Sequence, residues 1–387
     1  MSGLNFLEKL LDEVAVEWKT LGEVAKYEQP TKYLVKSTNY SDEFVTPVLT
    51  AGKTFILGYT DEINGIYRAS KTPVIIFDDF TTANKWVDFD FKAKSSAMKM
   101  ITSINDSKFI LKYVYYWLNT LPSELIDGDH KRQWISNFCN KKIPIPPLAI
   151  QAEIVRILDT CTALTAELVA ELVAELVDRK KQYEYYRDRL LTFEKGEVEW
   201  KTLGEIGEIR RGTAITEKET NPGDYPVVAN GPKHNYFHDQ SNRVGETVVI
   251  ARSGVYAGLV SYWDIPIFLT DAFSIHPNNN ALSAKFLYYV LKKDQTKIHN
   301  MSKGAGVPHV RAKDFESYKV PVPPLAEQAR IVTILDKFDT LTTSISEGLP
   351  REIALRQKQY EYYRDLLLSF PPPLTPPYQA TVYTQVI

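Results

Sequence analysis

PIPPLAIQAEIVRILD at residues 144–159 returns as PVPPLAEQARIVTILD at residues 321–336. A second block, QYEYYRDRLLTF at residues 182–193, returns as QYEYYRDLLLSF at residues 359–370, again 177 positions later. Two long blocks that recur at one fixed offset are the mark of an internal duplication. The repeated blocks therefore define a symmetric frame into which the other segments of the chain are inserted.

A shorter block precedes each copy, EWKTLGEV from residue 17 and EWKTLGEI from residue 199. The residues between the short and long blocks match only faintly. This order of variable and repeated segments predicts two modules that do parallel but different jobs on one symmetric frame.

Each long block continues as a helical pattern. Over residues 148–193 and 325–370 helix-forming residues dominate, and apolar residues step by three or four positions. A lone helix with one apolar stripe is unstable in water, so we expect the two helices to pack on each other as an antiparallel coiled coil.

The two helical segments differ at one place. Three tetrapeptides of the form xAEL occupy residues 165–176, whereas the second copy has Gly348 and Pro350 at the matching offset. Glycine ends helices and proline suits the first turn of a new one, so the sequence predicts a break near Gly348.

The variable regions predict an irregular, mostly β, α+β module in each half. Helices are expected at residues 109–121 and 284–293. Strand-like runs occupy residues 73–77, 86–91, 225–229, 246–251 and 261–269. The predicted domains are a first variable domain (1–147), a first helical spacer (148–198), a second variable domain (199–324), a second helical spacer (325–370) and a Pro-rich tail (371–387).

Composition limits the class of protein. The chain has 387 residues, 44% of them hydrophobic, and a net charge of −2. Each variable region nevertheless carries a small excess of basic residues, so a DNA-binding face must be a local patch. Cys139 and Cys161 have no metal-ligand spacing and are expected to be buried, free thiols. The absence of a signal peptide or an 18-residue apolar run leads us to expect a cytoplasmic protein.

No phosphate-binding loop, zinc motif or nucleophile elbow occurs in the sequence. Asp79, Asp90 and Lys92 have the loose spacing of a Mg²⁺-dependent nuclease site. Alternating charged and aromatic residues on a half-exposed strand produce the same string, and the structural interpretation is favoured. A nuclease therefore remains one alternative function, and a scaffold that binds proteins or glycans is another.

Basic and amide side chains set among glycines and polar residues are the stronger functional signal. Glycine allows close backbone approach, and these side chains hydrogen-bond phosphates and base edges. The candidate DNA-binding residues in the first module are Lys53, Asn84, Lys85, Lys131, Arg132 and Gln133. Those in the second module are Arg210, Arg211, Asn230, Lys233, Arg252, Lys303, His309 and Arg311.

The repeated QYEYYRD motif places tyrosines at helical spacing beside long polar side chains. Such a surface is more often a packing seam or a protein interface than a ligand platform, and the interface is favoured. The candidate interface residues are Gln182, Tyr183, Tyr186, Gln359, Tyr360 and Tyr363.

The two P(I/V)PPLxxQxxIVxILD blocks, the two QYEYYRD blocks and the xAEL tetrapeptides together make the chain resemble the specificity subunit of type I restriction–modification systems. The resemblance covers nearly the whole chain. It implies two target-recognition domains that read a bipartite double-stranded DNA sequence, separated by a coiled coil. It also implies a non-catalytic subunit that recruits modification subunits, two per chain, and then restriction subunits. S-adenosylmethionine, ATP and Mg²⁺ would be bound by these partners.

The xAEL run suggests how the DNA spacer is set. One four-residue unit adds about 6 Å and a rotation of about 40° to a helix. One base pair advances DNA by about 3.4 Å and about 34°. Because the rotations nearly match, the sequence predicts that the copy number of this unit sets the spacer length.

Overall fold

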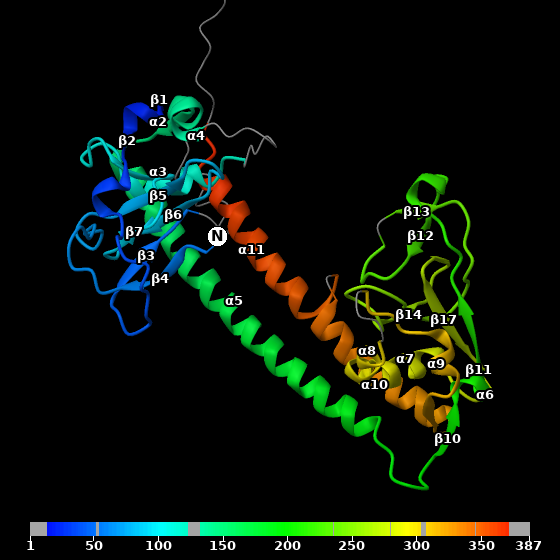
Figure 1. The fold of residues 1–387 in the computed structure, drawn as a ribbon. Helices are drawn as coiled ribbons and strands as arrows, with labels where there is room; N and C mark the ends of the chain where they lie inside the picture. The colour runs from blue at the N-terminus through cyan, green and yellow to red at the C-terminus, as the bar shows by residue number, and fades with distance from the viewer. Residues whose placement is uncertain are drawn as a thin grey trace, which may run out of the picture. The chain divides into compact units, whose positions relative to one another are not determined.

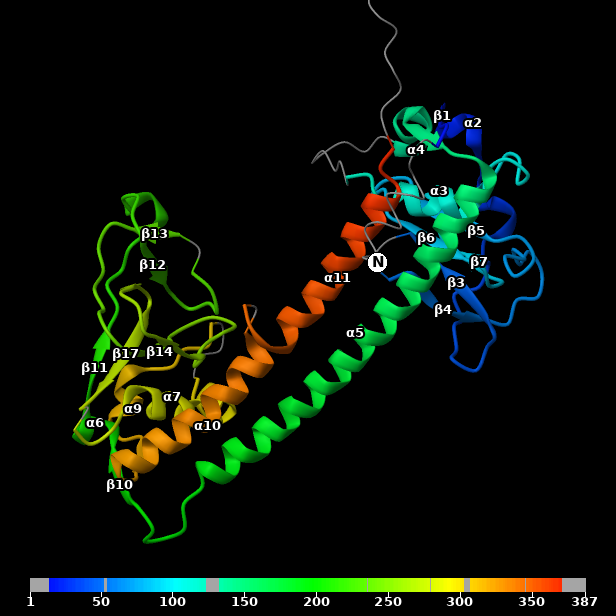
Figure 2. The same ribbon diagram turned by 180° about the vertical axis from the view of Figure 1, so that it is seen from behind.

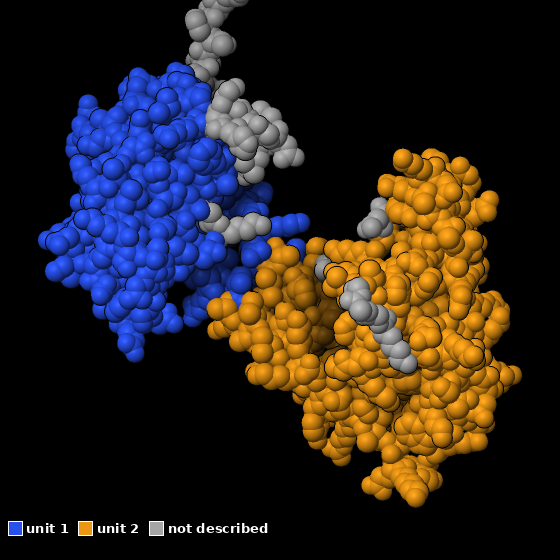
Figure 3. All heavy atoms as spheres, viewed as in Figure 1, with its two compact units in different colours: residues 1–169, 355–387 blue, residues 170–354 orange. Residues whose placement is uncertain are grey.

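The chain divides into two compact units, each of which draws on both halves of the sequence. The computed structural model describes residues 14–51, 54–122, 132–234, 236–278, 280–302, 307–344 and 346–370. Unit 1 comprises residues 1–169 and 355–387, and unit 2 comprises residues 170–354 (Figure 3). Each unit thus contains one variable region together with segments of both helical repeats.

Unit 1 is built on a four-stranded antiparallel sheet in the order β2-β8-β5-β6. A three-stranded sheet, β4-β3-β7, contains one antiparallel and one parallel pair, and β1 pairs with β9. The elements are β1 (Glu17–Thr20), α2 (Leu21–Val24), β2 (Ala25–Glu28), η1 (Pro30–Tyr33), β3 (Thr46–Leu49), β4 (Ile56–Thr60), β5 (Val74–Asp78), β6 (Asn84–Val87), β7 (Lys92–Ala93), β8 (Met98–Ser103), α3 (Leu111–Leu118), α4 (Gln133–Ser136), η2 (Phe138–Asn140) and β9 (Lys142–Ile145).

Unit 2 repeats this topology strand for strand. Its sheets are β11-β17-β14-β15, β13-β12-β16 and β10-β18, with the same parallel and antiparallel pairings. The elements are β10 (Glu199–Thr202), α6 (Leu203–Ile206), β11 (Gly207–Arg211), η3 (Glu217–Glu219), β12 (Tyr225–Val228), β13 (Phe237–His238), β14 (Thr247–Ala251), β15 (Val260–Trp263), β16 (Phe268–Leu269), β17 (Ala272–Pro277), α7 (Ala284–Lys293), α8 (Gln295–Asn300), α9 (Ala312–Glu316) and β18 (Lys319–Val322).

The predicted helices of the variable regions are confirmed as α3 and α7, and the α+β character is confirmed as well. Two predicted strands were too long. The first ends at Val87, after which Asp90 accepts hydrogen bonds from Ser70 and Arg68. The second is divided into β15 and β16 around Pro266, which has no N–H to donate to a sheet ladder.

The first repeat forms one uninterrupted helix, α5 (Leu148–Leu190), which ends three residues before the predicted end. The second repeat forms α10 (Leu325–Thr343) and α11 (Gly348–Leu367), so the predicted break is confirmed (Figures 1 and 2). Gly348 has a φ of +75°, and a Cβ built there would lie 2.5 Å from the Thr340 carbonyl oxygen. This position therefore requires glycine.

A buried glutamine fixes the start of each repeat helix to its globular module. The Gln151 side chain accepts from the Ile110 N–H at 3.0 Å and donates to the carbonyls of Lys108 and Pro146 at 3.0 and 2.9 Å. Gln328 makes the same three bonds with Ser283, Ala281 and Pro323. Both glutamines are buried, so each satisfies three backbone groups that water does not reach.

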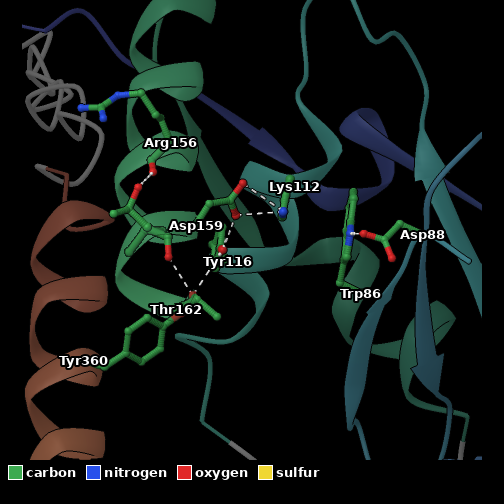
Figure 4. A network of polar contacts seen from close by, with 10 residues as sticks. Trp86, Asp88, Lys112, Tyr116, Arg156, Asp159, Thr162 and Tyr360 are labelled. Carbon is green, nitrogen blue, oxygen red and sulfur yellow. Dashed lines mark hydrogen bonds and ion pairs between the residues drawn. The ribbon is translucent and has the colours of Figure 1, made fainter. Parts of the chain in front are cut away.

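An aspartate two turns further along each helix makes a second fixed contact. The Asp159 carboxylate accepts a hydrogen bond from Tyr116 at 2.5 Å and lies 2.9 Å from the Lys112 ammonium, both on α3 (Figure 4). Asp336 bonds Tyr289 and Lys285 of α7 in the same way. Burial raises the pKa of Tyr289, and its bond to the Asp336 carboxylate raises that pKa further. These hydroxyls therefore stay protonated and donate to the carboxylate.

The repeats pack reciprocally and antiparallel within each unit. In unit 1 the Thr162 hydroxyl lies 3.0 Å from the Tyr360 hydroxyl, while Leu367 joins the core that contains Ile154 and Leu158 (Figure 4). In unit 2 Tyr183 and Tyr186 pack on the Phe338 ring, Tyr186 being stacked at 5.6 Å, while Leu191 joins the core of Ile331 and Leu335. The QYEYYRD motif of each repeat thus packs against the ILD region of the other.

The two cysteines correct a prediction. Both are free, as expected, but each is partly exposed instead of buried. Cys161 occupies the helix position that corresponds to Phe338, 177 residues later, and its smaller side chain fills less of the seam. Cys139 lies in the middle of the short helix η2, where its thiol donates to the Ile135 carbonyl at 2.9 Å. At both positions the surrounding residues leave the cysteine partly exposed.

Replacing Gln328 with leucine should weaken the junction between α10 and the module of unit 2. The change leaves the Ser283 N–H and two carbonyls without partners, and should lower the local stability by about 3 kcal/mol. Hydrogen exchange measured by mass spectrometry should show faster exchange around residues 281–286. The matched control is Gln357→Leu at an exposed position of α11. Equal exchange in the two variants would show that Gln328 does not fix α10 to the module of unit 2.

Candidate functional site

A basic pocket of about 750 Å³ lies on unit 2, between the end of β11, the β16–β17 turn, the loop after β14 and the segment before α9. Three arginines and a histidine line it: Arg211, Arg252, His309 and Arg311. All four are exposed, and all four belong to the predicted DNA-binding set. Residues from four separate segments thus meet in one place.

Close backbone packing brings these segments together. The Gly212 N–H donates to the Ala272 carbonyl at 2.8 Å, and the Thr213 N–H donates to the Leu269 carbonyl at 2.9 Å. A Cβ on Gly212 would lie 2.7 Å from the Leu269 oxygen, so a larger residue would push the Arg211 strand away from the turn. On the other side, the Val310 N–H donates to the Arg252 carbonyl at 2.9 Å.

Arg243, a buried arginine that the sequence analysis did not single out, holds the end of β11, where Arg211 lies. The Arg243 guanidinium donates to the Arg211 carbonyl and the Ser274 hydroxyl, both at 2.7 Å. Burial lowers the pKa of Arg243, and the nearby Arg210 charge lowers it further. Burial, followed by the charges of Arg210 and Arg243, also lowers the pKa of His276. The sequence shows Arg243 only as a lone arginine before a strand, which gives no signal of this role.

Asn230 organises the loop at the mouth of the pocket. Its side-chain oxygen accepts from the backbone N–H groups of Arg252 and Ser253 at 2.7 and 3.0 Å. Its amide nitrogen donates to the Ser253 hydroxyl at 2.9 Å and to the Asp271 carboxylate. The hydrogen-bonding capacity of Asn230 is therefore used within the protein. Its predicted role as a base reader stays a prediction.

Two further candidates of the second module, Arg210 and Lys233, are not among the residues that line the pocket. Arg210 is exposed and paired with Glu208, and Lys233 is exposed on the loop that leads to β13. Lys303 lies outside the described residues.

The first module places its candidates on β6 and at the start of α4. Lys85 and Arg132 are exposed. The Asn84 side chain accepts from the Asn119 amide at 3.0 Å, and the Gln133 N–H donates to the Asp79 carbonyl at 2.9 Å. Two further candidates, Lys53 and Lys131, lie outside the described residues.

The three residues of the nuclease alternative are held in separate structural contacts. Asp79 is buried 3.3 Å from the Lys99 ammonium and accepts from the Trp134 N–H at 2.8 Å. Lys92 is buried against Glu62 at 2.6 Å, whereas Asp90 pairs with Arg68 at 2.7 Å. The described residues contain no cluster of three potential metal ligands. The structure therefore gives the nuclease no support.

The tyrosine motif has an inner and an outer face. Tyr183, Tyr186, Tyr360 and Tyr363 contact other parts of the same chain, and burial raises the pKa of Tyr183 to about 12. Gln182 accepts from Arg179, and Gln359 accepts from Arg356. The tyrosines that face outward are Tyr185 and Tyr362, each 58% exposed. The packing-seam interpretation is thus visible within the chain, and a partner interface stays a prediction.

Comparison with known proteins identifies the family. Residues 13–177 and 195–355 each match the model of the type I restriction modification DNA specificity domain. The chain belongs to this family. The specificity subunit of the type I restriction enzyme EcoR124I/EcoR124II from Escherichia coli is 55% identical over 97% of this chain and 99% of its own length. The EcoprrI specificity subunit of Escherichia coli is 30% identical over 90% of this chain and 93% of its own length.

Solved structures of specificity subunits share the fold. The S subunit of a type I restriction–modification system from M. genitalium covers 93% of this chain with a TM-score of 0.55 at 19% identity. A chain from a structure of type I restriction–modification complex assembly covers 92% with a TM-score of 0.61 at 17% identity. The chain is thus a specificity subunit with two recognition domains, and its role is recognition instead of catalysis. No helix in the described part of the chain is long and apolar enough to cross a membrane.

The Lys92–Glu62 pair should make unit 1 sensitive to acid. The Glu62 carboxylate is hydrogen-bonded to Lys92 and to the Ser37 N–H. These bonds, the one to Lys92 having the larger effect, lower the pKa of Glu62 from 4.5 to about 2. The stabilisation is therefore present above about pH 4.5 and is lost as the pH falls towards 2. Glu62→Gln should reduce stability at neutral pH and flatten this acid dependence, as measured by denaturant unfolding at several pH values. Glu43→Gln, at an exposed position, is the control. Equal slopes for the two variants would exclude the pair as the cause.

Proposed function

We propose that unit 2 binds one half of a bipartite DNA target through its basic pocket. The convergence of Arg211, Arg252, His309 and Arg311 on one pocket supports this proposal most directly. Arginines neutralise phosphates and donate bidentate hydrogen bonds to guanine. Three arginines and a histidine from three separate segments fit a surface that follows the edge of a duplex better than a site for one small anion.

Unit 1 would bind the other half-site through the matching part of its fold. Arg132 precedes α4 as Arg311 precedes α9, and Lys85 adds an exposed cation on β6. The two modules share a topology but differ in these side chains, as two readers of different half-sites must. The recognition domains would be residues 1–147 and 199–324.

The repeat helices would set the spacer between the half-sites. The 43-residue α5 is about 65 Å long, which exceeds one DNA turn of about 34 Å. Within the xAEL run, Leu168, Leu172 and Leu176 are half-buried. Removing or adding one unit would retain this leucine face, since each unit repeats the same step.

The helices would also dock the partner proteins. The exposed Tyr185 and Tyr362 occupy equivalent positions in the two repeats, which suits two copies of one modification subunit per chain. These subunits would bind S-adenosylmethionine, and the restriction subunits that join them would use ATP and Mg²⁺. We further propose that the assembly works in the cytoplasm, where it meets cellular DNA.

Arg211→Ala and Arg311→Ala should each weaken DNA binding by the complex with modification subunits. Each change removes one phosphate or base contact, so the slope of log affinity against log salt should fall by about one where the contact is to phosphate. Fluorescence anisotropy with labelled target DNA at several salt concentrations would measure both the affinity and this slope. Lys297→Ala, an exposed cation of unit 2 outside the pocket, is the matched control. Unchanged affinity and slope in both arginine variants would overturn the assignment of the pocket.

Deleting residues 173–176 should shorten the DNA spacer by one base pair, because one xAEL unit and one base pair rotate by nearly equal angles. Sequencing of methylated DNA from cells that carry the variant and its modification subunit would give the spacer. Glu175→Gln keeps the helix length and should keep the spacer. An active deletion variant with the original spacer would contradict the mechanism.

A further inference from the structure

Two carboxylates, Glu219 and Asp271, stand among the cations of the basic pocket. Glu219 accepts from the Thr216 N–H and hydroxyl at 2.7 and 2.8 Å, and this capping role in η3 accounts for its presence. Asp271 lies in the turn between β16 and β17 and is half-exposed, in a pocket also lined by Arg211, Arg252 and Arg311. A carboxylate at a surface that binds phosphates works against affinity, because like charges repel. The presence of Asp271 in the lining of the proposed DNA-binding pocket therefore needs a reason.

The two carboxylate oxygens of Asp271 have different surroundings. Oδ2 accepts from the Asn230 amide and from the Ser253 hydroxyl, the latter at 3.1 Å. Oδ1 has a long contact of 3.4 Å with the Arg252 guanidinium, which is itself more than half exposed. A carboxylate oxygen can accept more than one hydrogen bond, so Oδ1 keeps accepting capacity that faces the pocket.

Loop architecture accounts for Oδ2 of Asp271, which holds Asn230 and Ser253, but not for Oδ1. The Asn230 side chain already holds the backbone N–H groups of Arg252 and Ser253, so this loop has an anchor of its own. The backbone of Asp271 has a φ of +35°, a conformation that glycine adopts without strain. Strained residues of this kind gather at binding sites, where the surrounding structure holds them in place. Here the Thr270 N–H donates to the Val228 carbonyl at 2.9 Å and ties the turn to β12.

The chemistry of DNA supplies a partner for Oδ1. In the major groove the hydrogen-bond donors are the exocyclic amino groups of cytosine and adenine, and acidic side chains accept from such groups. We propose that Asp271 is a specificity-determining residue that accepts a hydrogen bond from the amino group of one cytosine or adenine in the half-site read by unit 2. This inference rests on the proposed function of the pocket. Arg252 lies beside Asp271 and would contact the neighbouring base or phosphate.

The test compares Asp271→Ala with Asp264→Ala, which removes the same charge from an exposed position of unit 2 outside the pocket. Each variant is assembled with its modification subunits and offered DNA with randomised bases in both half-sites. Sequencing of the methylated products should show that Asp271→Ala loses about tenfold or more of its discrimination at one position of one half-site. The other half-site and the spacer should not change, and Asp264→Ala should retain the full target sequence.

The base is identified with duplexes that lack one amino group, deoxynebularine in place of adenine or deoxyzebularine in place of cytosine. Removing the amino group that Asp271 recognises should weaken binding of the unaltered protein by about tenfold, and should have little effect on Asp271→Ala. A uniform change in affinity for all sequences, with an unchanged target, would mean that Asp271 acts only through its charge and would overturn the proposal. Loss of all DNA binding by a variant with native hydrogen exchange would likewise overturn it. The arginine variants test the pocket independently, since they should weaken binding whatever the role of Asp271.

Discussion

The architecture depends on a buried amide at the start of each repeat helix. A helix of 43 residues with one apolar stripe gains little stability by itself, so its direction must be fixed by what holds its first turns. Gln151 and Gln328 each satisfy three backbone groups, one in the Pro-Pro segment before the helix and two in the module beside it. Because an unpaired buried amide is costly, other placements of the helix on the module are disfavoured. The glutamine in the repeated block is thus a geometric constraint on the entire frame.

Reciprocal packing explains why the two repeats must both be present. Unit 1 closes its core with Leu367 and Phe370 from the second repeat, and unit 2 closes its core with Leu191 from the first. Neither half of the sequence therefore contains all the residues of the larger core of its unit. The Cys161 and Phe338 positions show how far this symmetry tolerates change, since the same seam accepts a small side chain in one unit and a stacked aromatic ring in the other.

The frame could be predicted because its signals are local and repeated. Helix periodicity, the Gly348 break and the strands of the variable regions follow from nearby residues, and the structure contains all of them, with two strands shorter than predicted. The site was predicted only as a set of basic and amide side chains. Its organisation depends on pairs far apart in the sequence, such as Arg243 with Arg211 and Asp271 with Asn230, and single-sequence patterns carry no information on these pairings. For the same reason the role of Asp79 as a buried partner of Lys99 was visible only once the sheet was formed.

The two modules show how one topology can read different targets. In both units the first residue after β5 or β14 accepts a backbone hydrogen bond at its carbonyl from the start of a short helix or the residues just before it. The Asp79 carbonyl accepts from the Gln133 N–H, and the Arg252 carbonyl accepts from the Val310 N–H. The side chains at this shared position have opposite charge and opposite exposure, because Asp79 is buried against a lysine and Arg252 faces the basic pocket. Backbone geometry is thus kept by hydrogen bonds that any residue can make, while the side chain at the same point is left to vary. If these loops read the bases, as proposed above, a change of target sequence requires new side chains on them and leaves the helices and cores intact.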